Sequence, residues 1–384
     1  MGNQKVLVLT GQYGEGHKQA ANAIQQAMAL QNLHVDAVVL DPASLVHPTL
    51  DLISRNVFIS GVKKFPSLYH YFYEKTRQDN LASTILKGMN RLGIWRLLEF
   101  LNKMKPVAIV STCPVASGMI SILKEQGFVD IPLVTVITDY SAHSYWIYPH
   151  TDAYLAGSEG VRKGLEELGV PGSRVVVTGI PVDPKFTGDH NKRLLRRKYG
   201  LEKGMPTVLI TGGGYGMIGK GNGVFQSLEN ISKKLQIIVV CGHNDRLYNQ
   251  LGEQLSQSKH KVFLKGYVDH IEELMAVADI MVTKPGGLTV SEAIAMNLPM
   301  LLFPSIGGQE HDNTQFLLET KTALLALNAD DLCNKIELML KDHGVLASLQ
   351  YHGKQLQRKR TAFDAVEVIL DMLSSRQVAD FRFA

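Results

Sequence analysis

The stretch 283–293 combines residue types that often bind an anion. A strand-like run at 280–283 leads into a Pro-Gly-Gly turn at 285–287, and a helix-like apolar pattern follows. Glycines let the backbone approach a ligand closely, and the first N–H groups of a helix carry partial positive charge. This arrangement predicts a phosphate site, with Thr289 adding a hydroxyl group and Glu292 able to accept from a ribose. An ordinary strand-to-helix turn is the alternative.

A histidine follows the first glycine-containing turn of the chain. Gly14 and Gly16 come after the strand-like run 5–10, and His17 precedes a helix-like pattern at 18–31. Ligands gather at the carboxyl ends of strands in open α/β sheets, where a histidine can act as a general base near neutral pH. The third glycine of a dinucleotide fingerprint is missing, which argues against NAD binding. A capping or packing histidine is the alternative.

Three further strand ends carry residues suited to a ligand. Asp139 follows the apolar run 133–137 and could orient or charge-pair with a catalytic histidine, although aspartate is also a common turn former. The glycine cluster 212–216 follows the run 207–211 and suits close approach to phosphates or a sugar, or else forms a flexible lid. The polar cluster 307–313 suits the binding of sugar hydroxyls.

Strand-like and helix-like patterns alternate along the chain, which predicts an α/β protein with doubly wound parallel sheets. A length of 384 residues favours two domains. We expect an N-terminal domain at 1–180 and a second at 181–360, joined by the proline-containing and charged stretch 179–198. A last helix at 361–384 is expected to return to the N-terminal domain.

The composition fits a soluble globular protein in a reducing compartment. Hydrophobic residues make up 45% of the chain and charged residues 20%. The three cysteines lie among apolar residues without metal-ligand spacing: Cys113, Cys241 and Cys333. We see no signal peptide, no membrane span and no Asp-x-Asp motif for a diphosphate-bound metal, and expect a cytoplasmic location.

Residues 45–105 form a basic and aromatic segment. It holds ten Lys and Arg against four acidic residues, an excess of six in a chain whose net charge is only +4. Its aromatic residues are Phe58, Phe65, Tyr69, Tyr71, Phe72, Tyr73, Trp95 and Phe100. Interleaved cationic and aromatic side chains favour an anionic membrane surface as partner. A helical insertion with a solvated basic face is the alternative, and no nucleic-acid motif is present.

Taken in order, these motifs resemble a known family. They are Gly14-Glu15-Gly16-His17, Thr138-Asp139 with His143 and Trp146, Thr178-Gly179-Ile180-Pro181-Val182, the cluster 212–216, Gly266-Tyr267-Val268, Lys284-Pro285-Gly286-Gly287-Leu288-Thr289 with Glu292, and Gly308-Gln309-Glu310 with Asn313. The order is similar to that of the monogalactosyldiacylglycerol synthase and bacterial diacylglycerol glucosyltransferase group within family 28 glycosyltransferases. The resemblance covers almost the whole chain and is most specific between Gly266 and Asn313.

The resemblance implies a GT-B fold, in which two Rossmann-like domains face a cleft. It implies a UDP-sugar donor, UDP-glucose or UDP-galactose, and a diacylglycerol acceptor, with no cofactor or obligatory metal. The implied catalytic residues are His17 as base and Asp139, and the implied acceptor loop holds Gly14, Gly16, His143 and Trp146. The implied donor-binding residues are Gly213, Gly214, Tyr267, Val268, Pro285, Gly286, Gly287, Leu288, Thr289, Glu292, Gln309, Glu310 and Asn313.

The leading hypothesis is therefore an inverting transferase that moves a hexose onto diacylglycerol at the inner face of the cell membrane. Backbone N–H groups and a helix dipole would stabilise the UDP leaving group. Another lipid acceptor, such as an undecaprenyl-linked saccharide, and a nucleotide-sugar-binding regulatory protein without transfer activity are the alternatives. The residues do not decide between glucose and galactose, or between one transfer and several.

Overall fold

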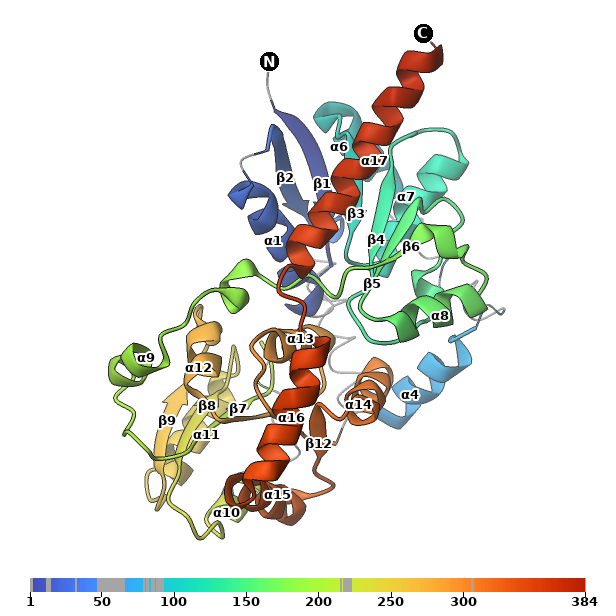
Figure 1. Cartoon of the computed structure of the whole chain (residues 1–384). Coiled ribbons are helices and arrows are strands. Elements are labelled where there is room, and N and C mark those ends of the chain that lie inside the picture. Colours follow the sequence, from blue (N-terminus) through green and yellow to red (C-terminus); the bar gives the residue numbers. More distant parts are fainter. Residues whose placement is uncertain are drawn as a thin grey trace. The chain divides into compact units, whose positions relative to one another are not determined.

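The computed structural model describes residues 3–11, 15–31, 33–46, 66–78, 80, 83, 87, 93–214, 216, 223–304 and 307–383. The chain forms two compact units (Figure 1). The N-terminal unit comprises Met1–Pro184, Ile306–Gln309 and Arg360–Ala384. The C-terminal unit comprises Lys185–Ser305 and Glu310–Lys359. Among the described helices, none combines the length and the apolar character needed to span a membrane.

The N-terminal unit is built on a sheet of six parallel strands in the order β2-β1-β3-β4-β5-β6. The strands are β1 (Gln4–Leu9), β2 (Val35–Leu40), β3 (Ala108–Ser111), β4 (Leu133–Val136), β5 (Ala153–Ala156) and β6 (Val175–Val177). Leu9 pairs in register with both Leu40 and Ser111, so the carboxyl ends of these three strands share one edge of the sheet. Loops that leave this edge carry the residues predicted to bind ligand.

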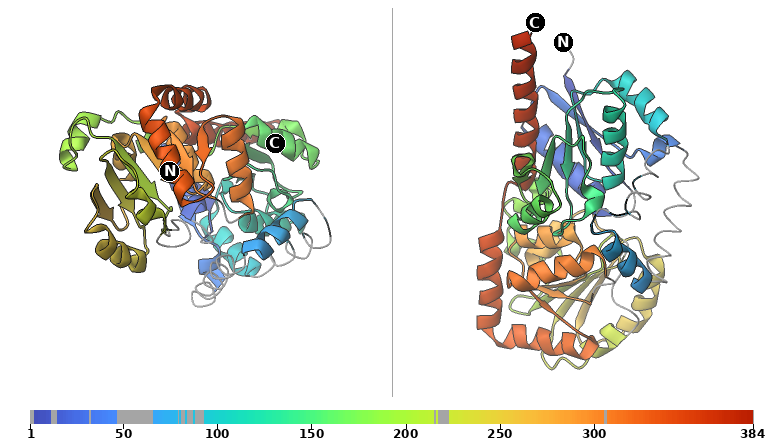
Figure 2. Two further views of the ribbon diagram at one scale, coloured as in Figure 1. Left: turned by 90° about the horizontal axis from the view of Figure 1, so that it is seen from below. Right: turned by 90° about the vertical axis from the view of Figure 1, so that its right-hand side faces the viewer.

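Helices cover both faces of this sheet (Figures 1 and 2). The helices are α1 (Glu15–Leu30), α6 (Ile94–Met104), α7 (Pro114–Glu125), α8 (Glu159–Glu167) and α17 (Thr361–Phe383). Apolar residues of α1 and α17 pack with Val6 and Val8 on one face, and those of α6 and α7 pack with Leu7 and Leu9 on the other. Both faces of β1 are therefore buried, as its apolar run predicts.

Only part of the basic and aromatic segment 45–105 lies within the described residues. Besides α6, it contains the end of α2 (Ala43–Val46) and α4 (Pro66–Lys75), in which proline takes the first helical position. The predicted aromatic residues Phe58 and Phe65 lie outside the described residues.

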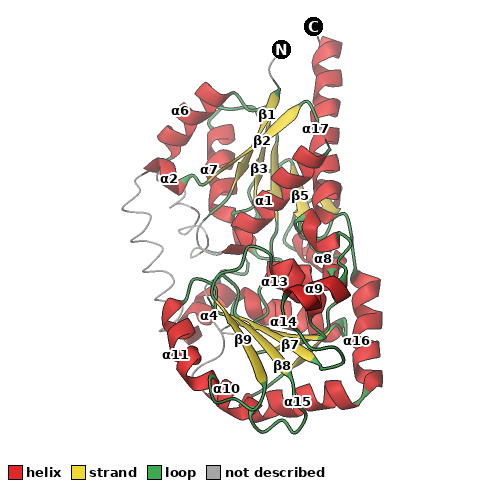
Figure 3. Ribbon diagram, turned by 90° about the vertical axis from the view of Figure 1, so that its left-hand side faces the viewer, coloured by secondary structure: helices red, strands yellow, loops and turns green. Residues whose placement is uncertain are grey.

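The C-terminal unit repeats the design with a sheet in the order β12-β11-β10-β7-β8-β9. Figure 3 shows its strands β7, β8 and β9 side by side. Its parallel strands are β7 (Thr207–Thr211), β8 (Gln236–Val240), β9 (Lys261–Lys265), β10 (Ile280–Thr283), β11 (Met300–Leu302) and β12 (Ala323–Leu325). Its helices are α9 (Lys192–Lys198), α10 (Gly223–Leu228), α11 (Asp245–Leu255), α12 (Ile271–Val277), α13 (Gly287–Ala295), α14 (Gln309–Glu319), α15 (Ala329–Lys341) and α16 (His343–Leu356).

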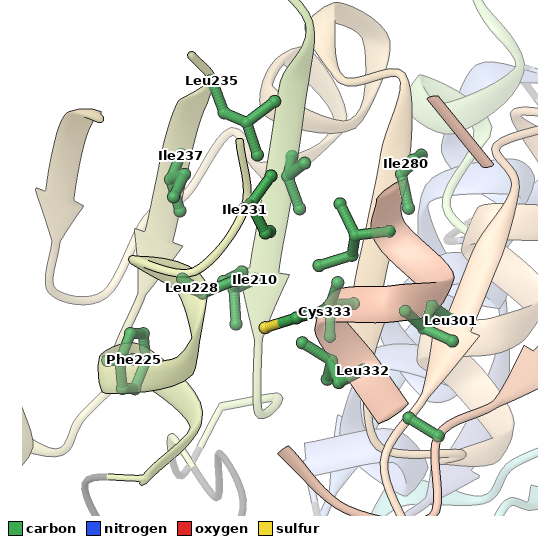
Figure 4. Packing of buried hydrophobic residues seen from close by; sticks show 14 of the residues in the cluster. Ile210, Phe225, Leu228, Ile231, Leu235, Ile237, Ile280, Leu301, Leu332 and Cys333 are labelled. Atoms are coloured by element: carbon green, nitrogen blue, oxygen red, sulfur yellow. The ribbon is translucent and has the colours of Figure 1, made fainter. Parts of the chain in front are cut away.

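One apolar cluster fills the space between this sheet and the helices on one of its faces (Figure 4). Ile210, Ile237 and Ile280 reach it from neighbouring strands, and Phe225 and Leu332 reach it from α10 and α15. Burial of such side chains, each contributing about 1.5–3 kcal/mol, holds the strand ends in fixed positions. The cluster therefore supports the loops that begin at those ends.

Each sheet has a topological switch point, where consecutive crossovers diverge to opposite sides. In the N-terminal unit it lies between β1 and β3, and in the C-terminal unit between β7 and β10. Ligands of open α/β sheets bind in the crevice outside the carboxyl ends of the strands at such points. The sheet orders thus indicate where a site should be sought in each unit.

The stretch expected to link the domains is more ordered than its composition predicts. A 3-10 helix at Pro184–Thr187 is followed by α9, which packs on α12 in the C-terminal unit. Arg196 of α9 donates hydrogen bonds to the carbonyl oxygens of Glu202 and Met205. These long-range contacts explain why a charged run without an apolar period is helical.

We expect Ile24→Ala to lower the stability of the N-terminal unit, because Ile24 of α1 is fully buried against the sheet. The cost should be about 2–5 kcal/mol. Differential scanning calorimetry would measure it as a lower unfolding temperature. Leu30 lies at the end of the same helix and is 61% exposed, so Leu30→Ala is the matched control and should change little. Equal losses in the two variants would contradict this packing.

Candidate active site

His17 lies at the switch point of the N-terminal sheet. It belongs to the first turn of α1, directly after the loop from β1. Its Nδ1 atom lies 3.0 Å from the hydroxyl oxygen of Thr138, which follows β4. Thr112, at the end of β3, donates a hydrogen bond of 2.9 Å to the backbone carbonyl of His17. The histidine is therefore held by residues from two other strand ends.

Burial sets the charge state of His17. The pKa of its imidazole falls from 6.5 to about 4, because burial disfavours the charged ring, and a smaller opposing effect comes from the backbone of Thr112. The ring is consequently neutral near pH 7. When Nδ1–H donates to the Thr138 oxygen, the lone pair of the neutral ring is on Nε2. The arrangement can accept a proton from a hydroxyl group.

The hydroxyl of Thr138, the residue before Asp139, contacts the ring of His17. Thr138 is the hydrogen-bond partner of the His17 ring, and it is buried. Adjacent residues after a strand point in different directions, so a one-residue shift decides which side chain meets the ring. Asp139 as a catalytic residue stays a prediction. Gly14 lies outside the described residues, and Gly16 precedes His17 within α1.

The two aromatic residues predicted for the acceptor loop are buried. The Trp146 ring meets the His17 ring edge to face, with centroids 5.9 Å apart. His143 packs against the ring of Tyr73, and its Nε2 lies 3.0 Å from the carbonyl oxygen of Tyr73. Its Nδ1 accepts from the backbone N–H of Tyr145. His143 thus holds α4 on the loop that leads to Trp146.

The Pro-Gly-Gly turn of the C-terminal unit lies at the switch point of its sheet. It follows β10 and leads into α13, whose N-cap is Gly286 with no side-chain cap. Asn313 of α14 is fully buried, and its amide donates a hydrogen bond of 3.0 Å to the carbonyl oxygen of Pro285. This hydrogen bond holds the turn in place through a residue of another helix, α14. An uncapped helix start after such a turn suits an anion.

The glycine loop after β7 is interlocked with the loop after β8. Gly242 has φ +58°, and a Cβ there would lie 2.3 Å from the carbonyl oxygen of Gly214. Gly216 has φ +57°, and a Cβ there would lie 2.0 Å from the carbonyl oxygen of Cys241. No other residue fits these two positions without displacing the backbone. The described part of the loop, which includes Gly213, is therefore a packed structure.

A stacked ring pair stands at the ends of β8 and β9. The rings of His243 and Tyr267 are nearly parallel, with centroids 4.1 Å apart. The backbone N–H of His243 donates to Gly214, so the same residue contacts the glycine loop and the Tyr267 loop. Tyr267 is 46% exposed and Val268 is next to it. The pair offers an aromatic surface at the edge where the nucleobase of the donor is predicted to bind.

An ion pair joins the Pro-Gly-Gly turn to the start of α14. Lys284 Nζ lies 2.9 Å from Glu310 Oε1. Glu310 follows Gln309, the first residue of α14, and both are partly exposed. Glu292 lies in α13, next to buried Ser291. The residues predicted for the phosphate and the hexose are thus neighbours through this pair and through Asn313.

Four residues at these sites have no role in the sequence-based prediction: Thr112, Thr138, His243 and Lys284. Each directly follows a strand or lies within three residues of its end. That position was the available signal, because the carboxyl ends of parallel strands meet at one edge. Their partners are distant in sequence, so no local pattern could reveal them. Within the described ranges, no group of three or more His, Cys, Asp and Glu side chains could hold a metal ion.

The fold has counterparts among solved structures. MurG of Acinetobacter baumannii superposes with a TM-score of 0.62 at 15% identity, covering 96% of this chain and 99% of its own. UGT2 of Phytolacca americana, solved with UDP-2fluoro-glucose and pterostilbene, superposes with a TM-score of 0.63 at 12% identity, covering 97% and 100%. With two parallel six-stranded sheets, the chain has the fold of the GT-B glycosyltransferases.

Sequence comparison is more specific. Residues 17–182 match the model of monogalactosyldiacylglycerol (MGDG) synthase, and residues 207–365 match that of the glycosyltransferase family 28 C-terminal domain. Processive diacylglycerol beta-glucosyltransferases of Bacillus mycoides and Bacillus cytotoxicus are each 32% identical to it, over 96% of this chain and 94% of theirs. The chain belongs to this family of diacylglycerol glycosyltransferases, hexosyltransferases that form a glycolipid from a UDP-sugar and diacylglycerol.

We expect the imidazole of His17 to titrate near pH 4 in the folded chain. Because this value lies below the ordinary 6.5, the stability that the neutral ring contributes is complete above pH 6.5. It is lost as the pH falls from there toward 4. NMR of isotope-labelled histidine would follow the titration, with the His17→Gln spectrum assigning the signal. A midpoint at the ordinary value would contradict the buried environment of the ring.

Proposed function

We propose that this chain transfers glucose from UDP-glucose to the free hydroxyl of diacylglycerol, with inversion, and that His17 is the base. The observation that carries the proposal is the placement of a partly buried His17 at the switch point of a sheet in a diacylglycerol glycosyltransferase, with its ring held by Thr138 and Trp146. Its low pKa keeps the base unprotonated across the physiological range. Such a base contributes about 10²–10⁴-fold to the rate.

In the proposed reaction the acceptor oxygen forms a bond to the anomeric carbon of glucose. The bond from that carbon to the β-phosphate oxygen breaks, and its electron pair stays on UDP. The acceptor proton passes to His17. Thr138 orients the ring through its hydrogen bond to Nδ1, so Thr138 is a positioning residue. Asp139 follows Thr138 and is the second predicted catalytic residue.

The donor roles of the C-terminal unit follow from its loops. The turn of Pro285 and Gly286 would present the backbone N–H groups of Gly287, Leu288 and Thr289, at the start of α13, to the diphosphate. Tyr267 and Val268 would hold the uracil, and Glu292 the ribose. Gln309 and Glu310 would accept hydrogen bonds from the hexose. The support is that these residues come from strand ends that meet at one edge.

The choice of glucose and the repeated transfer are supported by the relatives in the Bacillus species, which are named processive beta-glucosyltransferases. The name of the matching N-terminal family model points instead to galactose. The two sugars differ in the orientation of one hydroxyl group. We place glucose first because the whole-chain relatives cover both units, whereas the model covers residues 17–182 only.

The lipid acceptor stays in a bilayer, so we propose that the segment 45–105 docks on the inner face of the cell membrane. Tyr71 and Phe72 of α4 are each 55% exposed, and Trp95 of α6 is 63% exposed. The ammonium group of Lys75 lies 5.6 Å from the centroid of the Tyr71 ring. Exposed aromatic rings beside cationic groups suit the interface of an anionic membrane.

The transfer reaction can be tested with purified chain, diacylglycerol in anionic vesicles, and UDP-glucose or UDP-galactose in parallel. We expect glucosyl-diacylglycerol by mass spectrometry and, with time, a product carrying a second hexose. His17→Ala should slow the transfer by about 10²–10⁴-fold. It should leave UDP binding intact, because the residues predicted to bind the uracil, the ribose and the diphosphate belong to the C-terminal unit.

The other outcomes separate the alternatives. A galactosyl product would show that the transferred sugar is galactose and not glucose. Release of UDP without a lipid product would move the search to another acceptor, such as an undecaprenyl-linked saccharide. Binding of UDP with no transfer in any arm would favour a regulatory binding protein. Unchanged transfer in His17→Ala would remove His17 as the base.

The membrane contact has its own test. The triple variant Tyr71→Ala, Phe72→Ala, Trp95→Ala should lower binding to phosphatidylglycerol vesicles by about tenfold or more, because each ring buries apolar area in the interface. Vesicle sedimentation measures the bound fraction. Tyr351 of α16 is equally exposed at 63%, so Tyr351→Ala is the control and should bind as the wild type does. Equal loss in both variants would contradict docking through α4 and α6.

A further inference from the structure

Lys284 stands at the switch point of the C-terminal sheet. It directly follows β10, and the switch point lies between β10 and its neighbour β7. Its Cε atom lies 3.5 Å from the position that a Cβ on Gly213 would occupy, so its side chain runs along the glycine loop. Its ammonium group ends 2.9 Å from Glu310. The cation therefore lies between the glycine loop and the start of α14.

The surroundings of this ion pair make it sensitive to a ligand. The side chains of Lys284 and Glu310 are only 22% and 13% exposed. Charges that are partly removed from water need a partner, and each loses stabilisation if the other is removed. A more highly charged anion beside Lys284 would compete with the carboxylate for the ammonium group. The uncapped start of α13 lies two residues further along the chain.

We propose that Lys284 is the cation that meets the diphosphate of the donor, and that its ion pair with Glu310 is the resting state of the site. This inference rests on the proposed function of the C-terminal unit. When the donor binds, the ammonium group exchanges the carboxylate for phosphate oxygens. Glu310 is then free to accept hydrogen bonds from the hexose. The same cation stabilises the charge left on UDP when the anomeric bond breaks.

A purely structural pair would behave differently. Lys335 and Asp331 form such a pair within α15, with a distance of 2.7 Å and 27% exposure of each side chain. They are one helical turn apart and reinforce their own helix. Lys284 and Glu310, 26 residues apart, instead join the turn after β10 to the first turn of α14. The two ion pairs are similar in burial but lie in different parts of the unit, so the pair of Lys335 and Asp331 is a matched control.

The test is the affinity of the full-length chain for UDP, measured by isothermal titration calorimetry. Lys284→Met should weaken UDP binding by about tenfold to hundredfold, because it removes a charge-assisted contact to phosphate. It should also make binding less sensitive to salt. Lys284→Arg keeps a cation and should restore most of the affinity. Lys335→Met, the control, should bind UDP as the wild type does.

We expect Glu310→Gln to change UDP affinity in the opposite direction to Lys284→Met. This variant therefore distinguishes a pair that exchanges partners when the donor binds from a purely structural pair. Without the carboxylate, the ammonium group has no resting partner to leave, and UDP should bind about threefold to tenfold more tightly. Turnover of UDP-glucose should nevertheless fall, because a neutral amide accepts hydrogen bonds from the hexose more weakly than a carboxylate does. A structural pair predicts weaker UDP binding in Glu310→Gln as well as in Lys284→Met. Unchanged or weaker binding in Glu310→Gln would overturn the exchange.

These measurements separate the inference from the proposed function. UDP binding requires neither lipid nor sugar, so its response to the variants stands even if no glycolipid is formed. Absence of transfer in the wild type, with the predicted opposite changes in UDP affinity, would refute the proposed reaction and keep the role of Lys284. Normal transfer with unchanged UDP affinity in Lys284→Met would refute the role of Lys284 and keep the reaction.

Discussion

The constraint on which this structure depends is the reversal of strand order in each parallel sheet. Crossovers diverge between β1 and β3 and again between β7 and β10, and ligands of open α/β sheets bind outside the strand ends at such points. His17 and Lys284 stand at these two places. Their chemistry therefore follows from the topology, because any polar residue just beyond those strands meets loops from the neighbouring strand. The helices and apolar clusters serve to hold these edges still.

The two units manage charge in different ways. At His17, burial keeps the ring neutral, so its lone pair is available near pH 7. In the C-terminal unit, a positive and a negative side chain are held together at the ligand edge, so charge is present before a ligand arrives. A base needs an unprotonated lone pair, whereas a diphosphate is stabilised by a cation. Each unit thus has the electrostatic arrangement that its proposed half of the reaction requires.

Strands, glycine turns and their order could be predicted from the sequence, because parallel strands are short apolar runs and glycines end them. The position of His17 followed from the same reasoning. Contacts between distant residues could not be predicted: Thr138 hydrogen-bonds to the ring of His17, and His243 stacks on Tyr267. In each case the answer depends on how two strand ends are aligned, to within one residue. The helix α9 could not be predicted for a related reason. Packing on α12 and hydrogen bonds of Arg196 stabilise it, and its sequence has no apolar period.

The same alignment explains why backbone groups dominate the donor loops. At Gly242 and Gly216 the neighbouring loops approach so closely that a single added carbon would overlap a carbonyl oxygen. At Pro285 the carbonyl oxygen is already bonded by Asn313, which removes an acceptor from the turn. A turn whose carbonyl is occupied and whose following helix has no side-chain cap presents mainly donors. The proposed preference for an anion would therefore be a property of the backbone, to which Lys284 adds a charge that the backbone lacks.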